Sequence, residues 1–142
     1  MQVKSFMSDM IRFELEDVVG TENVSTSKTE RDTYSVDYFW ISRMWQDRGA
    51  QGPLPDIIVR PGCTEEVSKV LKIANYYKIP VHTWGGGSGS QGGALPMAGG
   101  ILLDMKRMNH LISIDESSHS ITAEAGMIFQ QLEWYANEKG YS

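Results

Sequence analysis

The stretch from Trp84 to Gly93 is the part of this sequence best suited to chemistry, because six of its ten residues are glycine. Glycine costs conformational entropy on folding, so such a cluster needs a compensating reason. Without Cβ atoms, successive backbone N–H groups can turn toward one anion and let it come close, as in a phosphate or diphosphate nest. The alternative is a flexible surface loop, but the stretch directly follows residues 79–83, which read as a strand. We therefore predict an anion-binding loop.

Two well-known phosphate-binding motifs do not account for this loop. Residues 87–92 match the dinucleotide fingerprint G-x-G-x-x-G, and Asp104 ends a later apolar run as a ribose-binding acid would. That fingerprint requires a helix that begins inside the glycine turn, whereas Pro96 and four glycines between positions 92 and 100 leave no room for one. The lysine of a P-loop is absent as well. The pattern predicts a strand, a loop of backbone donors and another strand, with no helix between them.

Other side chains give weaker signals. His82 lies next to the loop and is either a hydrogen-bonded structural histidine or a group that contacts the bound ligand. His110 and His119 are expected in solvated turns, and Cys63 is expected to be a small buried thiol, although thiolates are favoured before a helix. The three histidines are not spaced as a metal cluster, and their order supports no Ser-His-Asp arrangement. We predict no metal site, and the catalytic residues stay unknown.

The N-terminal part is expected to contain a helix and an aromatic-rich connector. Apolar residues recur at near-helical spacing in residues 1–19, which predicts an amphipathic helix that ends at Gly20. Residues 21–33 are polar and are expected to form a loop, and residues 47–55 read as a connector. Aromatic side chains bury large areas, so we expect most of the aromatic patch between them to pack, with a wall beside a flat ring as the alternative. The patch comprises Tyr34, Tyr38, Phe39, Trp40 and Trp45.

A strand–helix–strand pattern leads into the glycine loop. Residues 57–59 are a continuous apolar run, which is typical of a strand covered on both faces. A helix is expected next, with Thr64 as its N-cap and two glutamates in its first turn, where the helix dipole favours anions. With the strand at residues 79–83 and its short joints, this is a βαβ unit with parallel strands. Residues 101–104 read as a third strand.

The pattern changes after the third strand. Residues 111–114 are mostly apolar, a turn rich in Asp and Ser follows, and residues 120–124 alternate as a half-exposed antiparallel strand does. A last helix is expected over residues 128–136, with Gly140 as its C-terminal cap. The predicted fold class is α+β (α/β), in which a small parallel βαβ subdomain precedes the start of a second, mixed or antiparallel sheet subdomain with flanking helices.

Composition excludes several classes of partner. The chain has 142 residues, a net charge of −5 and no run of Lys or Arg, which argues against nucleic acid. No apolar stretch approaches the roughly 20 residues that span a bilayer, and residues 1–10 lack the apolar core of a signal peptide. The single cysteine, Cys63, excludes an internal disulfide. We expect a cytoplasmic protein with no membrane span.

Seven motifs stand in order between Pro55 and Tyr141. They are Pro55-Asp56-Ile57-Ile58-Val59-Arg60-Pro61, Glu66-Val67, Ala74 to Pro80, the glycine loop, Gly100-Ile101-Leu102-Leu103-Asp104-Met105, Met108-Asn109 and Glu124-Ala125-Gly126. This series resembles the FAD-binding domain of the vanillyl-alcohol-oxidase or p-cresol-methylhydroxylase type. It is most similar to the branch of the glycolate-oxidase flavin subunit, D-lactate dehydrogenase and alkyl-dihydroxyacetone-phosphate synthase, which shares a Tyr-and-Asp segment like Tyr34-Ser35-Val36-Asp37.

The resemblance implies that the diphosphate of FAD binds to the glycine loop. Ser88 stands where the family often has threonine and would add a hydroxyl, whereas Gly89 stands where serine is frequent. Relatives that attach flavin covalently through this loop use a histidine near Ser88, and serine cannot form that bond, so FAD is expected to be non-covalent. The implied cofactor-binding residues are Thr83, Trp84, Gly85, Gly86, Gly87, Ser88, Gly89, Ser90, Gly92, Glu124, Ala125 and Gly126.

The resemblance also implies a division of the chain. Residues 1–54 would form an N-terminal helix and an aromatic-rich connector, and residues 55–142 the first part of an FAD-binding domain. The family's domain continues with a second segment that completes the FAD site, and a separate cap domain carries the substrate pocket and most catalytic residues. The chain is therefore expected to be a truncated family domain that is inactive alone.

Three functions remain open. The first is the FAD-binding portion of an oxidoreductase that oxidises a small 2-hydroxy acid, such as glycolate or D-lactate, by hydride transfer to FAD. The second is an enzyme like the alkyl-dihydroxyacetone-phosphate synthase, which uses FAD without net redox and is compatible with Phe39-Trp40 and Gly140-Tyr141. The third is a cofactor-free fragment that associates with a second copy or with a missing downstream part.

Overall fold

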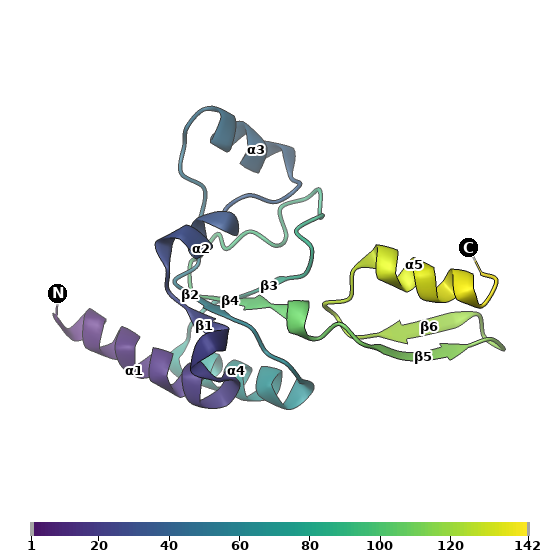
Figure 1. Cartoon of the computed structure of the whole chain (residues 1–142). Helices are drawn as coiled ribbons and strands as arrows, with labels where there is room; N and C mark the ends of the chain where they lie inside the picture. Colours follow the sequence, from purple (N-terminus) through teal and green to yellow (C-terminus); the bar gives the residue numbers. More distant parts are fainter. Residues whose placement is uncertain (1, 142) are drawn as a thin grey trace.

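The computed structural model describes residues 2–141 and contains a four-stranded sheet and a separate two-stranded hairpin (Figure 1). The order in the main sheet is β1-β2-β4-β3, in which β2, β4 and β3 are parallel and β1 is an antiparallel edge strand. The strands are β1 (Val24–Ser25), β2 (Ile57–Val59), β3 (Val81–Trp84) and β4 (Ile101–Asp104). The predicted parallel strands are confirmed, and β4 lies between β2 and β3.

Every residue of β2 and β4 is buried, so both faces of these central strands are covered. Their continuous apolar runs predict this. One face packs against α1 (Gln2–Val19) and α4 (Thr64–Tyr77). The buried residues of this layer are Ile11, Leu15, Val19, Ile57, Val59, Val70, Ala74, Ile101 and Leu103. A smaller cluster covers the other face and consists of Tyr34, Ile58, Trp84 and Leu102. The residue that precedes the glycine loop, Trp84, thus belongs to the second cluster.

Helix α4 follows β2 as predicted, but it begins differently from the sequence prediction. Thr64 is the first helical residue, and Cys63 occupies the N-cap position with an extended backbone and no side-chain cap hydrogen bond. The Glu66 carboxylate accepts a hydrogen bond from the backbone N–H of Gly62 at 2.7 Å. The assignment of Thr64 as N-cap was wrong because a glutamate in the first turn, rather than a hydroxyl before it, satisfies the amide that precedes the helix.

Residues 21–33 are not the loop that their polarity predicts. After α1 ends at Gly20, as predicted, they form η1 (Thr21–Asn23), β1 and α2 (Lys28–Thr33). Backbone pairing overrides composition here, because β1 extends the sheet by pairing with β2. The first 54 residues therefore contribute a strand to the main sheet, and a division of the chain at residue 54 stays a prediction.

The aromatic patch is split between core and surface. Tyr34 is 5% exposed, whereas Tyr38 and Trp40 are 62% and 65% exposed, so the expectation that most of the patch packs holds only in part. The patch leads into an unpredicted helix, α3 (Trp40–Asp47). The Asp37 carboxylate fixes its start by accepting hydrogen bonds from the Phe39 N–H and the Ser42 hydroxyl, both at 2.9 Å.

The C-terminal part follows its prediction closely. β5 (Leu111–Asp115) and β6 (Ser120–Ala123) form an antiparallel hairpin, and α5 (Phe129–Glu138) lies beside it (Figure 1). This unit projects to the side of the main sheet, to which η2 (Met105–Arg107) connects it (Figure 1). Gly140 caps α5 at φ 81° in the hydrogen-bond pattern of a Schellman motif. The predicted α+β class is confirmed. Among residues 2–141, no helix is both long and apolar enough to cross a bilayer.

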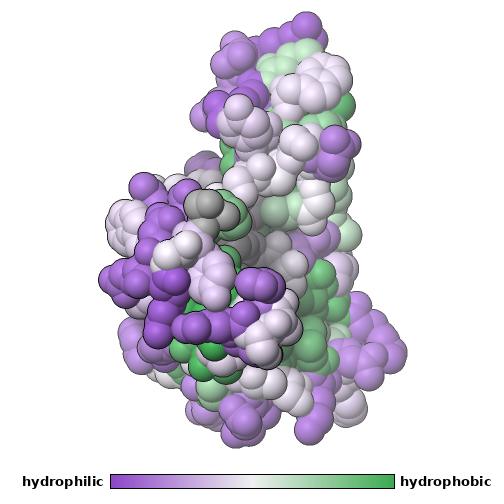
Figure 2. All heavy atoms as spheres, turned by 90° about the vertical axis from the view of Figure 1, so that its right-hand side faces the viewer, coloured by the Kyte–Doolittle hydropathy of each residue, from purple (hydrophilic) through white to green (hydrophobic). Residues whose placement is uncertain are grey.

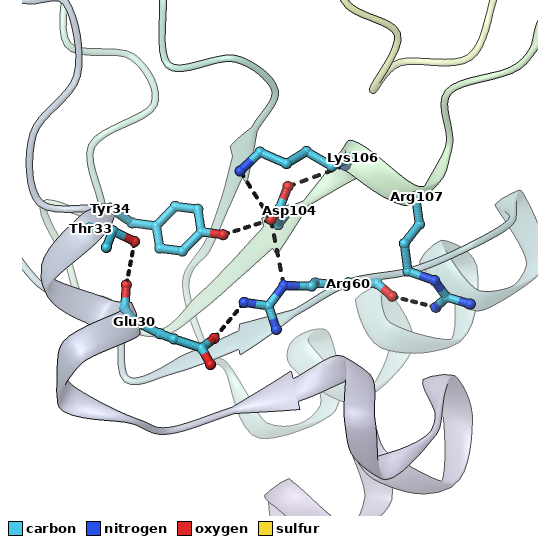
Figure 3. Close-up of polar contacts among 7 residues, drawn as sticks. All are labelled: Glu30, Thr33, Tyr34, Arg60, Asp104, Lys106 and Arg107. Carbon is cyan, nitrogen blue, oxygen red and sulfur yellow. Dashed lines mark hydrogen bonds and ion pairs between the residues drawn. The ribbon is translucent and has the colours of Figure 1, made fainter.

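A buried carboxylate at the end of β4 fastens the N-terminal part to the sheet (Figure 3). Asp104 is 1% exposed and accepts a hydrogen bond from the Tyr34 hydroxyl at 2.6 Å. Nε of Arg60 and Nζ of Lys106 lie 3.6 and 3.7 Å from the same carboxylate oxygen, and Arg60 also pairs with Glu30 of α2. Burial, together with the neighbouring Asp104 carboxylate, raises the pKa of Tyr34 to about 12.

We predict that the titration of Tyr34 lowers the free energy of unfolding at alkaline pH. Its hydroxyl titrates at pH 10.0 when unperturbed and at about pH 12 in the folded protein, so its contribution is fully present below pH 10 and is lost as the pH rises toward 12. Urea unfolding between neutral and strongly alkaline pH should show a shallower loss in Tyr34→Phe than in the wild type. Tyr76→Phe, at a 78% exposed position, should keep the wild-type profile. Identical profiles for all three proteins would contradict the assignment.

Candidate functional site

The glycine loop leaves the carboxyl end of β3, and the chain then returns to β4, the neighbouring parallel strand. Residues 85–100 form turns and bends with no helix among them. The absence of a helix confirms that the G-x-G-x-x-G match over residues 87–92 is accidental, because the dinucleotide motif needs a helix there. The carboxyl edge of parallel strands is also where ligands bind in open α/β sheets.

The backbone donors of this loop are free. Within residues 2–141, no amide from Gly85 to Ala94 donates a hydrogen bond to a protein acceptor. Most of these residues lie at the surface, and Ser88, Gly89 and Ser90 are all exposed. Consecutive N–H groups with no protein partner and no negative side chain among them suit a bound anion. The donor set therefore fits a diphosphate.

The glycines of the loop fall into two groups. Gly87 and Gly92 have φ angles of 65° and 74°, and a Cβ atom there would lie 2.5 Å from the Trp84 ring and 2.8 Å from the Phe39 ring. The fold itself therefore requires glycine at these two positions. By contrast, a Cβ atom at Gly86 would meet only the Ser88 hydroxyl at 4.0 Å, and one at Gly89 would meet nothing. No contact within the protein requires glycine at these two positions. The close approach of a ligand to the backbone would explain why glycine stands there.

The second predicted segment lies beside the first. The Ala125 carbonyl oxygen is 3.9 Å from the position of a Cβ atom at Gly85, so the loop and residues 124–126 adjoin. Gly126 packs so tightly that a Cβ atom would lie 1.8 Å from the Met105 carbonyl oxygen. The role of Gly126 in the structure is thus close packing against η2, and its N–H donates to the Met108 carbonyl at 2.8 Å.

Glu124 is committed to a partner within the protein. Its carboxylate accepts a hydrogen bond from the His110 backbone N–H at 2.8 Å and lies 2.7 Å from Nδ1 of the same residue. These hydrogen bonds, the backbone one first, lower the pKa of Glu124. His110, expected to be merely solvated, thus holds a predicted site residue. Contact between Glu124 and a cofactor would run through its backbone.

Trp84 could either stack on a cofactor ring or pack behind the loop, and His82 could either make a structural hydrogen bond or contact the ligand. Trp84 is 6% exposed and packs behind the loop, with its ring edge-on to Tyr34 at 5.1 Å, so the packing alternative holds over stacking on a cofactor. For His82, the expected structural hydrogen bond is missing, because Nε2 is buried without a partner among residues 2–141. In the same part of the chain, no three His, Cys, Asp or Glu side chains gather so as to hold a metal ion.

A cleft of about 410 Å³ opens between the loop and α3. Its lining residues are Val36, Asp37, Tyr38, Arg43, Gln46, Trp84, Gly86, Gly87 and Ser88. Sequence reasoning placed the last four of these in the site and did not assign Arg43 or Gln46, because α3 itself was not predicted. Arg43 brings a positive charge to this wall, with its guanidinium 5.1 Å from the centre of the Tyr38 ring. The Tyr34-to-Asp37 segment is the part of the sequence that could have indicated this wall, because Val36 and Asp37 line the cleft.

A separate apolar surface lies on the hairpin and α5. Figure 2 views the molecule from this end and shows green hydrophobic patches among hydrophilic residues. Ile112, Ile128 and Phe129 are 62%, 62% and 77% exposed. Exposed apolar groups of this kind often mark interaction surfaces. Association of the chain with a second copy or with a missing downstream part stays a prediction.

Comparison with known proteins agrees with the geometry. Residues 55–142 match the model of a family described as "FAD binding domain". The glycolate oxidase subunit GlcD of Bacillus subtilis is 30% identical over 130 residues, which cover 92% of this chain and 26% of that protein. A mitochondrial D-lactate dehydrogenase (cytochrome) of Kluyveromyces lactis is 32% identical over 132 residues, covering 89% and 22%. An alkyldihydroxyacetonephosphate synthase structure superposes with a TM-score of 0.82 at 24% identity, covering 93% of this chain and 25% of the other.

These matches differ in what they establish. The chain spans about a quarter of the length of the relatives it matches. The synthase likeness shows the fold, while the family model covers more than half of the chain and includes both predicted cofactor segments. The free amides of the loop provide the donor set that such a domain needs. The chain therefore belongs to the FAD binding domain family of the p-cresol-methylhydroxylase type, and its cofactor is FAD.

Proposed function

We propose that residues 83–92 hold the diphosphate of FAD, and that the protein is an FAD-linked oxidoreductase acting on a small 2-hydroxy acid such as glycolate or D-lactate. The observation that carries the first part is the run of amides from Gly85 to Ala94 without protein acceptors. The second part is supported by the glycolate oxidase subunit and the D-lactate dehydrogenase, each of which aligns with about nine-tenths of the chain.

The residues of the chain would divide the binding task among them. Amides of Gly85, Gly86 and Gly87 would donate to the diphosphate, and the exposed hydroxyls of Ser88 and Ser90 would add further donors. Trp84 would support the loop from behind, on the face of the sheet that it shares with Tyr34. The Arg43 charge beside the same cleft would favour an anionic ligand.

The redox chemistry belongs to the cofactor. When bound, FAD would supply the two-electron acceptor that oxidation of a 2-hydroxy acid to a 2-oxo acid by hydride transfer requires. The residues of this chain bind and orient the dinucleotide, and we assign none of them to the proton transfer. We further propose that FAD is held without a covalent bond through this loop, because Ser88 offers no nitrogen to attach it.

We predict that Gly86→Trp abolishes most FAD binding by occupying the space above the loop amides. A Cβ atom at this exposed position has room, so the variant should fold. Loss of one or two hydrogen bonds to a charged group weakens affinity by about tenfold or more. Titration of the chain with FAD, followed by flavin fluorescence, gives the affinity. Ala50→Trp places the same ring on the exposed connector after α3 and should bind as the wild type does. Equal affinities for all three proteins would refute the assignment of the loop.

The mode of attachment is tested on FAD-loaded protein. After acid precipitation, the flavin should remain in the supernatant and the pellet should be colourless, because only non-covalent contacts hold the cofactor. Free FAD mixed with denatured protein controls for trapping in the pellet. A yellow pellet that survives washing would show a covalent bond.

The substrate class is tested on a full-length protein that contains this chain. We predict that anaerobic addition of glycolate or D-lactate bleaches the absorbance of the bound flavin, since hydride transfer reduces it. L-Lactate and acetate, which lacks the hydroxyl group, serve as controls. Flavin that stays oxidised with both glycolate and D-lactate would contradict a 2-hydroxy-acid oxidoreductase, although the FAD site itself would stand.

A further inference from the structure

Residues 34–42, here called the clamp segment, grip the glycine loop although they lie outside the matched family region. The Tyr38 backbone N–H donates to the Gly87 carbonyl at 2.9 Å. The Phe39 ring packs directly on Gly92, where a Cβ atom would lie only 2.8 Å from it. The clamp segment thus contacts the loop at two of the glycines whose φ angles are positive.

The clamp segment is itself firmly held. The Tyr34 hydroxyl donates to the buried Asp104 carboxylate at 2.6 Å (Figure 3), and its ring lies edge-on to Trp84 at the base of the loop. At its other end, Asp37 is 4% exposed and Ser42 is 0% exposed, and their side chains are hydrogen-bonded to each other at 2.9 Å. The segment therefore ties the loop to the central strand β4.

The loop needs such external support because it has little of its own. Within residues 2–141, its amides from Gly85 to Ala94 make no hydrogen bond to the protein. Glycine also has the widest choice of backbone conformations, so an unsupported loop would lose much entropy when a ligand orders it. A loop that is ordered before binding avoids that loss and binds more tightly.

We propose that the clamp segment preorganises the glycine loop for the FAD diphosphate, with Phe39 as its main positioning residue. The inference rests on the proposed FAD loop and extends it to a part of the chain that the family region does not include. Phe39 touches the backbone of the loop rather than the ligand, so it sets the conformation in which the amides are presented. The alternative is that Phe39 only fills space and contributes to overall stability.

The test compares three variants by NMR order parameters of the loop amides, by hydrogen exchange in β2 and α4, and by FAD titration. In Phe39→Ala, the backbone order parameters of residues 85–94 in the free chain should fall, and FAD affinity should fall about fivefold, because ordering the loop then accompanies binding. Exchange in β2 and α4 should not change. Phe39→Tyr keeps a ring against Gly92 and should restore both values. Trp134→Ala removes an aromatic side chain of α5 that lies outside the clamp segment and is 57% exposed, and it should behave as the wild type does.

Each result decides the matter. Unchanged order parameters of the loop and unchanged FAD affinity in Phe39→Ala would overturn the clamp, and so would accelerated exchange in β2 and α4, since that pattern means general destabilisation. Failure of the wild-type chain to bind FAD would overturn the proposed function together with the clamp. Normal wild-type binding with no effect of Phe39→Ala would overturn the clamp alone.

Discussion

The structure depends on one feature, a run of backbone amides from Gly85 to Ala94 that the described protein leaves without acceptors. Buried amides of this kind would be costly, so they lie at the surface, at the carboxyl edge of two parallel strands. Backbone donors are directional and carry no side chain that must be ordered. The diphosphate that we propose to bind there would be held by the fold itself, which would account for a loop rich in glycine and poor in charge.

The rest of the chain gives this loop a fixed foundation. On one face of the sheet, α1 and α4 supply the larger apolar layer that holds β2 and β4 in register. On the other face, the Tyr34–Trp84 pair and the Asp104 carboxylate replace a covering helix. This second layer is thin and partly polar, and it lies directly below the loop. Tyr34 and Trp84 therefore belong both to the core and to the support of the loop.

Local signals were sufficient for much of the fold. The continuous apolar strands, the helix between them, the alternating hairpin and the Gly140 cap all follow from patterns that span fewer than about 15 residues. The exclusion of a helix after the glycines also followed from residues within the loop. Recognition of FAD came from the order of seven motifs rather than from any one of them, and the family match agrees with it.

The predictions that failed depend on contacts between distant residues. β1 forms because β2 offers a free edge, which the polar sequence of residues 21–33 does not reveal. Thr64 lost the N-cap role to a contact made by Glu66. The α3 wall of the cleft was not predicted, because α3 starts from hydrogen bonds to the Asp37 side chain. The hydrogen bond between His110 and the Glu124 carboxylate was not predicted either, because these residues lie fourteen positions apart in the chain.

The most direct test of the loop is hydrogen exchange of the wild-type chain with and without FAD, with riboflavin and adenosine as ligands that lack the diphosphate. We expect FAD to slow exchange specifically over residues 85–94, because each amide that donates to a diphosphate oxygen is protected. Riboflavin and adenosine should leave these residues unprotected. Protection of the loop by either of them, or binding of FAD with no protection there, would contradict the account.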